Sequence, residues 1–304
     1  FIMRINTNIS SLGAQEAAKN TNNSIANSLE KLSTGLKINK ASDDASGLAI
    51  ADKLRTQVTS INQGIANGNS AIALLQIADK SMAEQSKILD TVKAKLIQAN
   101  TDTTSSIGRV AIAKDVNKLL DQLNNIAEQT NYNGTALLQK KMGSEASATV
   151  SSDGLTFQIG ESNTDIISTK SIQANVTGYS LNSLKTDASA GANLATISTD
   201  GKTVLTNGFT RTMASAHMDR IDAAITKLNG YRGDIGSTQN QVESAVRNLM
   251  TQSTNIKAAE AIIRNVDYAE ESANFNKLNI ISQAGSYAIS QSNATQQNVL
   301  RLLQ

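Results

Sequence analysis

The stretch that decides the fold is residues 221–263, IDAAITKLNGYRGDIGSTQNQVESAVRNLMTQSTNIKAAEAII. Its apolar ladder has intervals of three, four or seven residues and consists of Ile221, Ile225, Leu228, Ile235, Val242, Val246, Leu249, Ile256 and Ile263. This spacing puts the ladder on one face of an α-helix, and so long a helix must bury that face against other helices. The chain contains no proline, so no residue of that kind interrupts the pattern.

A second ladder lies in the N-terminal part and consists of Ile61, Ile65, Ile72, Leu75, Met82, Leu89 and Leu96. It predicts a helix over about 45–100, with Ser42, Asp43 or Asp44 as the N-cap. Gly64 and Gly68 predict a break or kink in that helix. Similar patterns predict helices over 5–36, 105–130, 212–264 and 267–304. Gly35 is expected just beyond the end of the first helix, because glycine is favoured there.

The middle of the chain has a different character. Residues 149–159 predict a β-hairpin, with further strands at 166–167 and 172–176. Residues 178–211 are rich in Ser, Thr, Ala, Gly and Asn with little periodicity, and they predict a short, exposed surface segment. The fold class that we expect is mainly α: a long antiparallel helical coiled-coil bundle built from both chain ends, with a small β-hairpin segment in the middle.

The two outermost helices carry poor apolar stripes. We interpret the first stripe as Ile5, Ile9, Leu12, Ile25, Leu29, Leu32 and Leu36, and the last as Leu278, Ile281, Ala284, Ala288, Val299 and Leu302. A lone helix with so little apolar surface is marginal in water. We therefore predict that both ends become ordered only when they assemble with other copies of the chain.

Composition excludes several classes of function. Aromatic residues are 3% of the chain, which is little for the interior of a large enzyme. The net charge of +2 does not favour nucleic acid as a partner. Cysteine is absent, which excludes disulfides and thiolate metal sites. No apolar run is long enough to insert into a membrane, and residues 1–8 lack the apolar core of a secretory signal peptide.

No set of residues indicates catalysis, a cofactor or a metal, so we expect no enzyme. His217 is the sole histidine, and we place it on a helix surface. Adjacent Asp43 and Asp44 resemble an acid pair, but helix capping explains them better. Glu270 and Glu271 are expected on a solvated face. Asn175-Val176-Thr177 matches the glycan acceptor pattern, which is common by chance.

Several short motifs in the N-terminal and C-terminal parts of the chain resemble those of a known protein family. Residues 5–8 (INTN), 32–39 (LSTGLKIN) and 43–50 (DDASGLAI) resemble the N-terminal region of bacterial flagellin, and residues 129–134 (QTNYNG) resemble the turn after its third helix. Residues 263–271 (IRNVDYAEE) and 297–303 (QNVLRLL) resemble its C-terminal region. The resemblance covers roughly the first 140 and the last 90 residues, with the motifs in the family's order.

The resemblance implies a division into domains. Residues 1–44 with 262–304 would form an inner filament-core domain, and residues 45–177 with 212–261 a helical rod domain with β-hairpins. Residues 178–211 would be the short variable segment, in place of the large outer domains of many flagellins. Asp43 and Asp44 would then also contact neighbouring subunits.

The resemblance also implies a function. The chain would be a secreted structural subunit that assembles with itself into the extracellular flagellar filament for motility. Its partners would be the type III export apparatus, a flagellin chaperone, and the filament cap and junction proteins. The alternatives are a hook–filament junction protein, a non-flagellar secreted coiled-coil scaffold, and an enzyme hidden in residues 135–211.

One segment departs from the pattern of flagellins that the innate flagellin receptor detects. Those proteins carry a Leu-Gln-Arg-x-Arg-Glu-Leu-like motif. Here the segment after Ile88 reads Leu89, Asp90, Thr91, Val92, Lys93 and Ala94. An acid and a small residue replace two arginine contacts, and Lys93 stands in place of the glutamate. The segment is similar to that of epsilon-class flagellins, and the resemblance implies weak binding to the receptor.

Overall fold

The computed structural model describes residues 8–139, 154–193, 196–197, 203–204 and 208–302. The described part is mainly α-helical, which confirms the expected fold class. The chain divides into two compact units, one of residues 1–59 with 252–304 and one of residues 60–251. None of the described helices is long and apolar enough to cross a membrane.

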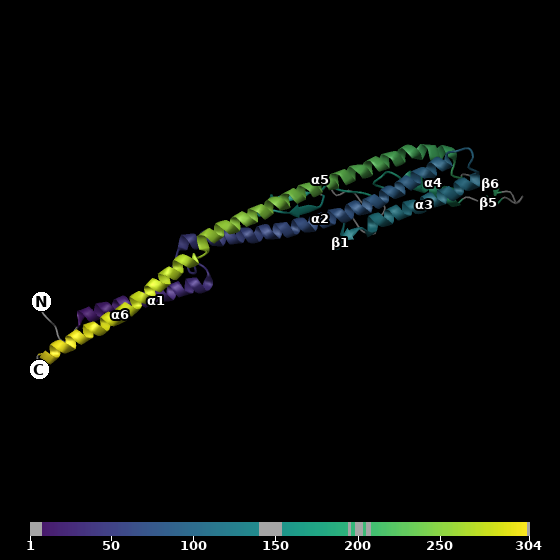
Figure 1. Cartoon of the computed structure of the whole chain (residues 1–304). Coiled ribbons are helices and arrows are strands. Elements are labelled where there is room, and N and C mark those ends of the chain that lie inside the picture. The colour runs from purple at the N-terminus through teal and green to yellow at the C-terminus, as the bar shows by residue number, and fades with distance from the viewer. Residues whose placement is uncertain (1–7, 140–153, 194–195, 198–202, 205–207, 303–304) are drawn as a thin grey trace. The chain divides into compact units, whose positions relative to one another are not determined.

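The helices are α1 (Ile9–Thr34), α2 (Ala45–Ala99), α3 (Ser106–Gln129), α4 (Asn182–Asn193), α5 (Arg211–Arg264) and α6 (Tyr268–Leu302) (Figure 1). Three antiparallel two-stranded hairpins are described: β1 (Asn131–Tyr132) with β2 (Thr135–Ala136), β3 (Thr156–Gln158) with β4 (Ile166–Ser168), and β5 (Thr196–Ile197) with β6 (Thr203–Val204). The predicted helices are thus confirmed to within a few residues. The predicted strand at 149–150 lies outside the described residues.

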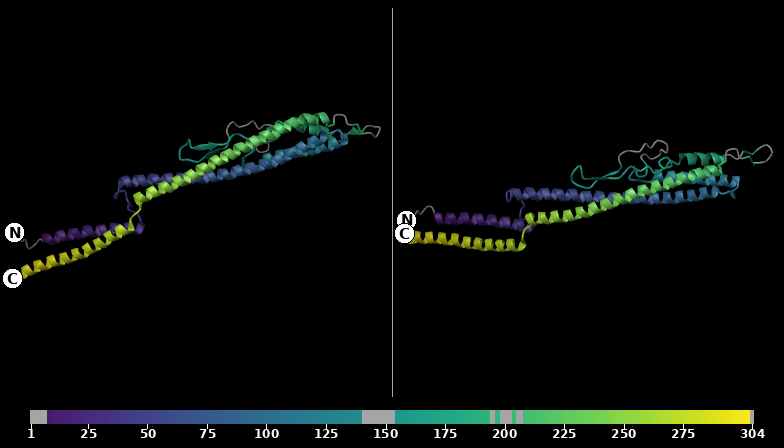
Figure 2. Two further views of the ribbon diagram at one scale, coloured as in Figure 1. Left: turned by 45° about the horizontal axis from the view of Figure 1, so that its top comes forward. Right: turned by 90° about the horizontal axis from the view of Figure 1, so that it is seen from above.

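The core of the 60–251 unit is built from two heptad ladders. In this unit α2 and α5 run antiparallel beside each other, and α3 lies alongside α2 (Figure 2). The residues Leu75, Met82, Leu89 and Leu96 of α2 are spaced by seven, and all are buried. The residues Ile221, Leu228, Ile235 and Val242 of α5 are also spaced by seven and buried. These ladders confirm the pattern from which the helices were predicted.

Helix α2 is continuous through Gly64 and Gly68, so the predicted break is wrong. The glycines instead permit close approach. A Cβ on Gly64 would lie 1.8 Å from the carbonyl oxygen of Ile159, and a Cβ on Gly68 would lie 2.4 Å from a methyl carbon of Val246. The β3–β4 hairpin and α5 can therefore pack directly against the backbone of α2.

Residues 172–176 form no strand, so that prediction is also wrong. Their backbone groups are bound by other partners. The Ala174 carbonyl accepts a hydrogen bond from the buried side chain of Gln85 (2.7 Å), and the Val176 amide donates to the side chain of Asn124 (2.9 Å). A backbone held by side chains of α2 and α3 does not need a neighbouring strand. Asn175 is buried, so it is unsuited as a glycan acceptor.

Residues 178–193 are not an exposed surface segment, contrary to the prediction. They contain helix α4, and the apolar residues Leu181, Leu184 and Ala188 are fully buried in the core of the 60–251 unit. Their spacing of three and four forms one helix face, although the segment is otherwise small and polar. Phe209, close to the start of α5, is buried in the same core.

The prediction for His217 is wrong as well. Its side chain is 4% exposed, and its Nε2 lies 2.8 Å from a carboxylate oxygen of Asp187 on α4. Its Nδ1 is buried and has no hydrogen-bond partner among the described residues. The residue therefore fixes α4 against α5. A buried polar residue needs a specific partner. The partner of His217 is Asp187, which lies 30 positions away in the chain, so the local sequence does not reveal it.

The close approach at Gly64 yields a test of the fold. Glycine to alanine in a helix interior normally stabilises a protein by about 0.5–1 kcal/mol. Gly64→Ala should instead destabilise the chain by about 1–3 kcal/mol, because the new methyl group overlaps the Ile159 carbonyl. Chemical denaturation followed by circular dichroism measures this change.

Gly236→Ala is the matched control, because a Cβ at that position of α5 meets nothing within 4 Å. It should leave stability unchanged or raise it. Equal effects of the two substitutions would contradict the packing described for Gly64.

Candidate functional site

Helices α1 and α6 form an antiparallel pair in the unit of residues 1–59 with 252–304, and their chain-terminal ends lie together (Figure 1). Polar side chains join them along the whole pair. Asn8, the N-cap of α1, donates to Ser292 (3.3 Å), and Ser282 donates to Asn22 (3.3 Å). At the other end the hydroxyl of Ser28 donates to Glu271. Glu271 is therefore engaged by α1 and is not on a solvated face, unlike exposed Glu270.

One heptad seam of α1 residues is buried or half-buried, and it consists of Ser11, Ala14, Ala18, Thr21, Ile25, Ser28 and Leu32. The corresponding seam of α6 consists of Glu271, Phe275, Leu278, Ser282, Gly285, Ile289 and Ser292. A Cβ on Gly285 would lie 4.0 Å from Ala18. Most seam residues are small or polar, so the helices approach closely while burying little apolar surface.

The structure divides the stripe predicted for α1. Ile25 and Leu32 lie on the seam, whereas Ile9, Leu12 and Leu29 point away from it and are 73%, 55% and 55% exposed. The prediction of a single stripe was wrong because Leu12 and Ile25 are roughly 3.6 turns apart, which places them on opposite sides of the helix. Exposed Ile9 and Leu12 are thus available to partners outside the chain.

Helix α6 shows the same division. Leu278 lies on the seam, but Ile281 is 43% exposed. Sequence reasoning missed Ile280 and Tyr287, which are 67% and 74% exposed. Their separation of seven residues was the signal that marks one helix face. Together, Ile9, Leu12, Leu29, Ile280, Ile281 and Tyr287 are here named the outer apolar residues.

The remaining stripe residues are less informative. Ile5 lies outside the described residues, and Val299 and Leu302 lie in α6 with side chains outside the described part. Leu36 is half-buried and pairs with Asn265 in an antiparallel bridge beyond the ends of α1 and α5.

Asp44 caps a helix, as the sequence suggested, whereas Asp43 binds backbone amides of the turn that precedes it. Asp44 is the N-cap of α2, since its carboxylate accepts a hydrogen bond from the Gly47 amide (2.9 Å). Asp43 accepts from the amides of Lys40 and Asn39, at 3.0 Å each. These two bonds hold the pKa of the Asp43 carboxyl below its ordinary value. The turn between α1 and α2 is therefore fixed by side-chain oxygens.

Residues 89–94 of α2, which stand in place of the motif detected by the innate flagellin receptor, are only partly accessible. Leu89 and Val92 are fully buried in the core of the 60–251 unit. Asp90, Thr91 and Ala94 are exposed, while Lys93 is half-buried and forms an ion pair with Asp222 of α5. A partner at this segment thus meets a carboxylate and small side chains.

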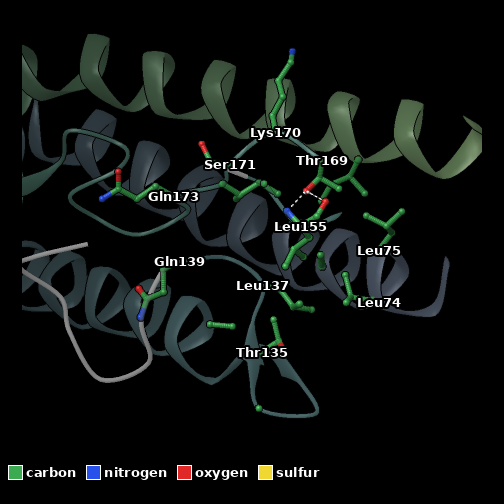
Figure 3. A pocket seen from close by; sticks show the side chains of 16 residues that line it. Leu74, Leu75, Thr135, Leu137, Gln139, Leu155, Thr169, Lys170, Ser171 and Gln173 are labelled. Atoms are coloured by element: carbon green, nitrogen blue, oxygen red, sulfur yellow. Dashed lines mark hydrogen bonds between the residues drawn. The ribbon is translucent and has the colours of Figure 1, made fainter. Parts of the chain in front are cut away.

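A cavity of about 360 Å³ lies between α2, the 134–139 segment and the 154–155 and 169–173 segments (Figure 3). It has apolar walls that include Leu74, Leu75 and Leu137. Lys170 is the one titratable residue among the described residues that line the cavity, and its ammonium pairs with Asp234 at 2.9 Å. The described part of the lining thus offers no acid–base pair. Among the described residues no group of three or more His, Cys, Asp or Glu side chains forms a metal site.

Comparison with known proteins agrees with this architecture. The model of the bacterial flagellin N-terminal helical region matches residues 5–142, and that of the flagellin C-terminal helical region matches residues 218–303. The flagellin of Bacillus subtilis strain 168 is 33% identical over 99% of this chain and 100% of its own length. The flagellar filament 30.7 kDa core protein of Treponema maltophilum is also 33% identical, with the same coverage of both chains.

A solved structure shares the fold. The putative flagellar hook-associated protein of Vibrio parahaemolyticus superposes with a TM-score of 0.56 over 73% of this chain and 99% of its own, at 13% identity. Both family models and the relatives that match over the whole length give one result: the chain belongs to the bacterial flagellin family.

Proposed function

We propose that this chain is a structural subunit of the flagellar filament and that the outer apolar residues of α1 and α6 are the surface through which its copies assemble. The observation that carries the proposal is the contrast in burial between the two units. Among the described residues, every fully buried apolar side chain except Ile38, Ala51 and Val58 lies within residues 60–251. The terminal helices therefore have almost no apolar core of their own.

Assembly supplies what the single chain lacks. Burying a large aliphatic or aromatic side chain contributes about 1.5–3 kcal/mol. The outer apolar residues of one copy gain this contribution only against another copy, because the seam partner already occupies the opposite helix face. Contacts between different faces of identical subunits, when they do not close into a ring, produce an open helical polymer. Residues 1–44 with 262–304 form the inner part of this polymer in our proposal.

The family also supports the broader biological role. Flagellins are structural proteins of the extracellular filament, and the relatives that match over the whole chain carry the names flagellin and flagellar filament core protein. We propose that this subunit is secreted by the flagellar type III apparatus with the help of a chaperone, and that it meets the cap and junction proteins in the growing filament. It performs no catalysis in this role.

The outer apolar residues can be tested by substitution. The double variant Ile280→Ser, Tyr287→Ser removes two side chains from the proposed contact. It should raise the critical concentration for polymerisation by about tenfold or more, since each 1.4 kcal/mol of lost contact energy corresponds to a factor of ten. Sedimentation of purified protein, with electron microscopy of the pellet, measures the change.

Ile107→Ser is the matched control, because Ile107 is as exposed as Ile280, at 67%, but lies in the 60–251 unit. It should polymerise like the unmodified protein. Thermal melting of all three proteins should coincide. A double variant that polymerises normally would contradict the proposal.

We further propose weak recognition by the innate flagellin receptor. Asp90 presents a carboxylate where the detected flagellins carry an arginine, and Lys93 is engaged with Asp222. A receptor-reporter cell assay should give little activation by the purified monomer. Asp90→Arg restores one cation at an exposed position and should increase activation. Strong activation by the unmodified protein would refute this prediction.

A further inference from the structure

The β1–β2 hairpin turns through only two residues, Asn133 and Gly134. Both have positive φ, 49° and 79°, as a tight two-residue hairpin turn requires. Both are exposed, and no hydrogen bond joins the Asn133 side chain to another of the described residues. The ladder pairs Tyr132 with Thr135 and Asn131 with Ala136, so the Gly134 amide is outside the ladder, in an exposed residue.

The sequence contains four Asn-Gly pairs, at 67–68, 133–134, 207–208 and 229–230, and the structure distinguishes them. Asn67 lies in α2 and its side chain is held at both ends, by Gln63 (2.9 Å) and by the Gln158 carbonyl (3.0 Å). Asn229 is exposed like Asn133, but Gly230 lies within α5, where its amide belongs to the helical hydrogen-bond ladder. Asn207 lies outside the described residues.

We propose that Asn133 is a site of spontaneous covalent modification, namely deamidation through a succinimide. The Gly134 backbone nitrogen loses its proton to hydroxide and attacks the side-chain carbonyl carbon of Asn133. A carbon–nitrogen bond forms, the side-chain carbon–nitrogen bond breaks, and the departing nitrogen takes a proton from water and leaves as ammonia. Water then opens the five-membered ring at either carbonyl, which gives aspartate or isoaspartate at position 133.

Three features of the turn favour this reaction. Glycine has no Cβ to obstruct the attack on its neighbour. The amide is exposed, so hydroxide can reach it and the rate rises with pH. The Asn133 side chain can rotate toward the amide without breaking a hydrogen bond to any described residue. In α2 and α5 the same attack first requires a helical turn to open, which costs free energy.

The modification affects the fold beneath the turn. Isoaspartate lengthens the main chain by one carbon, so a two-residue turn can no longer hold the register Tyr132↔Thr135 and Asn131↔Ala136. Leu137 and Leu138 follow directly and are buried in the core. Deamidation also adds one negative charge to the tip of the hairpin.

The test uses the full-length folded protein, which is kept in mildly alkaline buffer and sampled over days. Peptide mapping by mass spectrometry locates the conversion of amide to acid, and isoaspartyl methyltransferase labelling identifies the isoaspartate product. Conversion at Asn133 should be several-fold faster than at Asn229 and at Asn67, and it should accelerate with pH. Equal rates at the three sites in the folded protein would overturn the proposal.

The same protein in concentrated urea supplies the control for local sequence. Unfolding frees the amides of Gly68 and Gly230, so the three rates should converge. If Asn133 keeps its advantage in urea, flanking sequence and not the turn sets the rate, and the proposal fails. Asn133→Gln should remove the labelled product at this peptide, because glutamine forms a larger ring much more slowly.

Discussion

The close contact between α1 and α6 is the constraint on which the rest of the account depends. Their facing residues are mostly Ser, Ala, Gly and Thr, with Ile25, Leu32, Phe275, Leu278 and Ile289 as the larger apolar members. Such a seam lets two helices pack tightly and fixes their register through hydrogen bonds such as Ser282 to Asn22. It buries little apolar surface, so it orients the pair more than it stabilises it. The outer apolar residues remain exposed on the other faces of the two helices.

The 60–251 unit has the opposite organisation. Its heptad ladders on α2 and α5, together with α3 and α4, enclose a continuous apolar core, and polar residues such as Gln85 and His217 are buried there with hydrogen-bond partners. This unit contains what a stable monomeric domain needs. Most of the apolar core that stabilises the single chain thus lies in residues 60–251, and we infer that the terminal helices form the contacts between subunits.

Much of this could be predicted from sequence, because the informative patterns are local. The seven-residue spacing of Leu75, Met82, Leu89 and Leu96 defines one helix face whatever its partner is. Errors arose where the partner decides the outcome. Ile25 is half-buried because α6 covers it, whereas Leu29 is exposed. The sequence of α1 alone does not show which of its faces α6 will cover. Gly64 is typical of a helix break in the sequence, but its role is to let the Ile159 carbonyl approach the backbone of α2. For α4 the signal existed in Leu181, Leu184 and Ala188, but the surrounding small polar residues obscured it.

Amide hydrogen exchange of the same protein as monomer and as polymer tests the central claim most directly. In the monomer, the amides of α1 and α6 should exchange much faster than those of α2 and α5 within residues 60–251, because little buried apolar surface protects them. After polymerisation the exchange of α1 and α6 should slow strongly, while that of the 60–251 core changes little. Equal protection of the terminal helices in monomer and polymer would contradict the account.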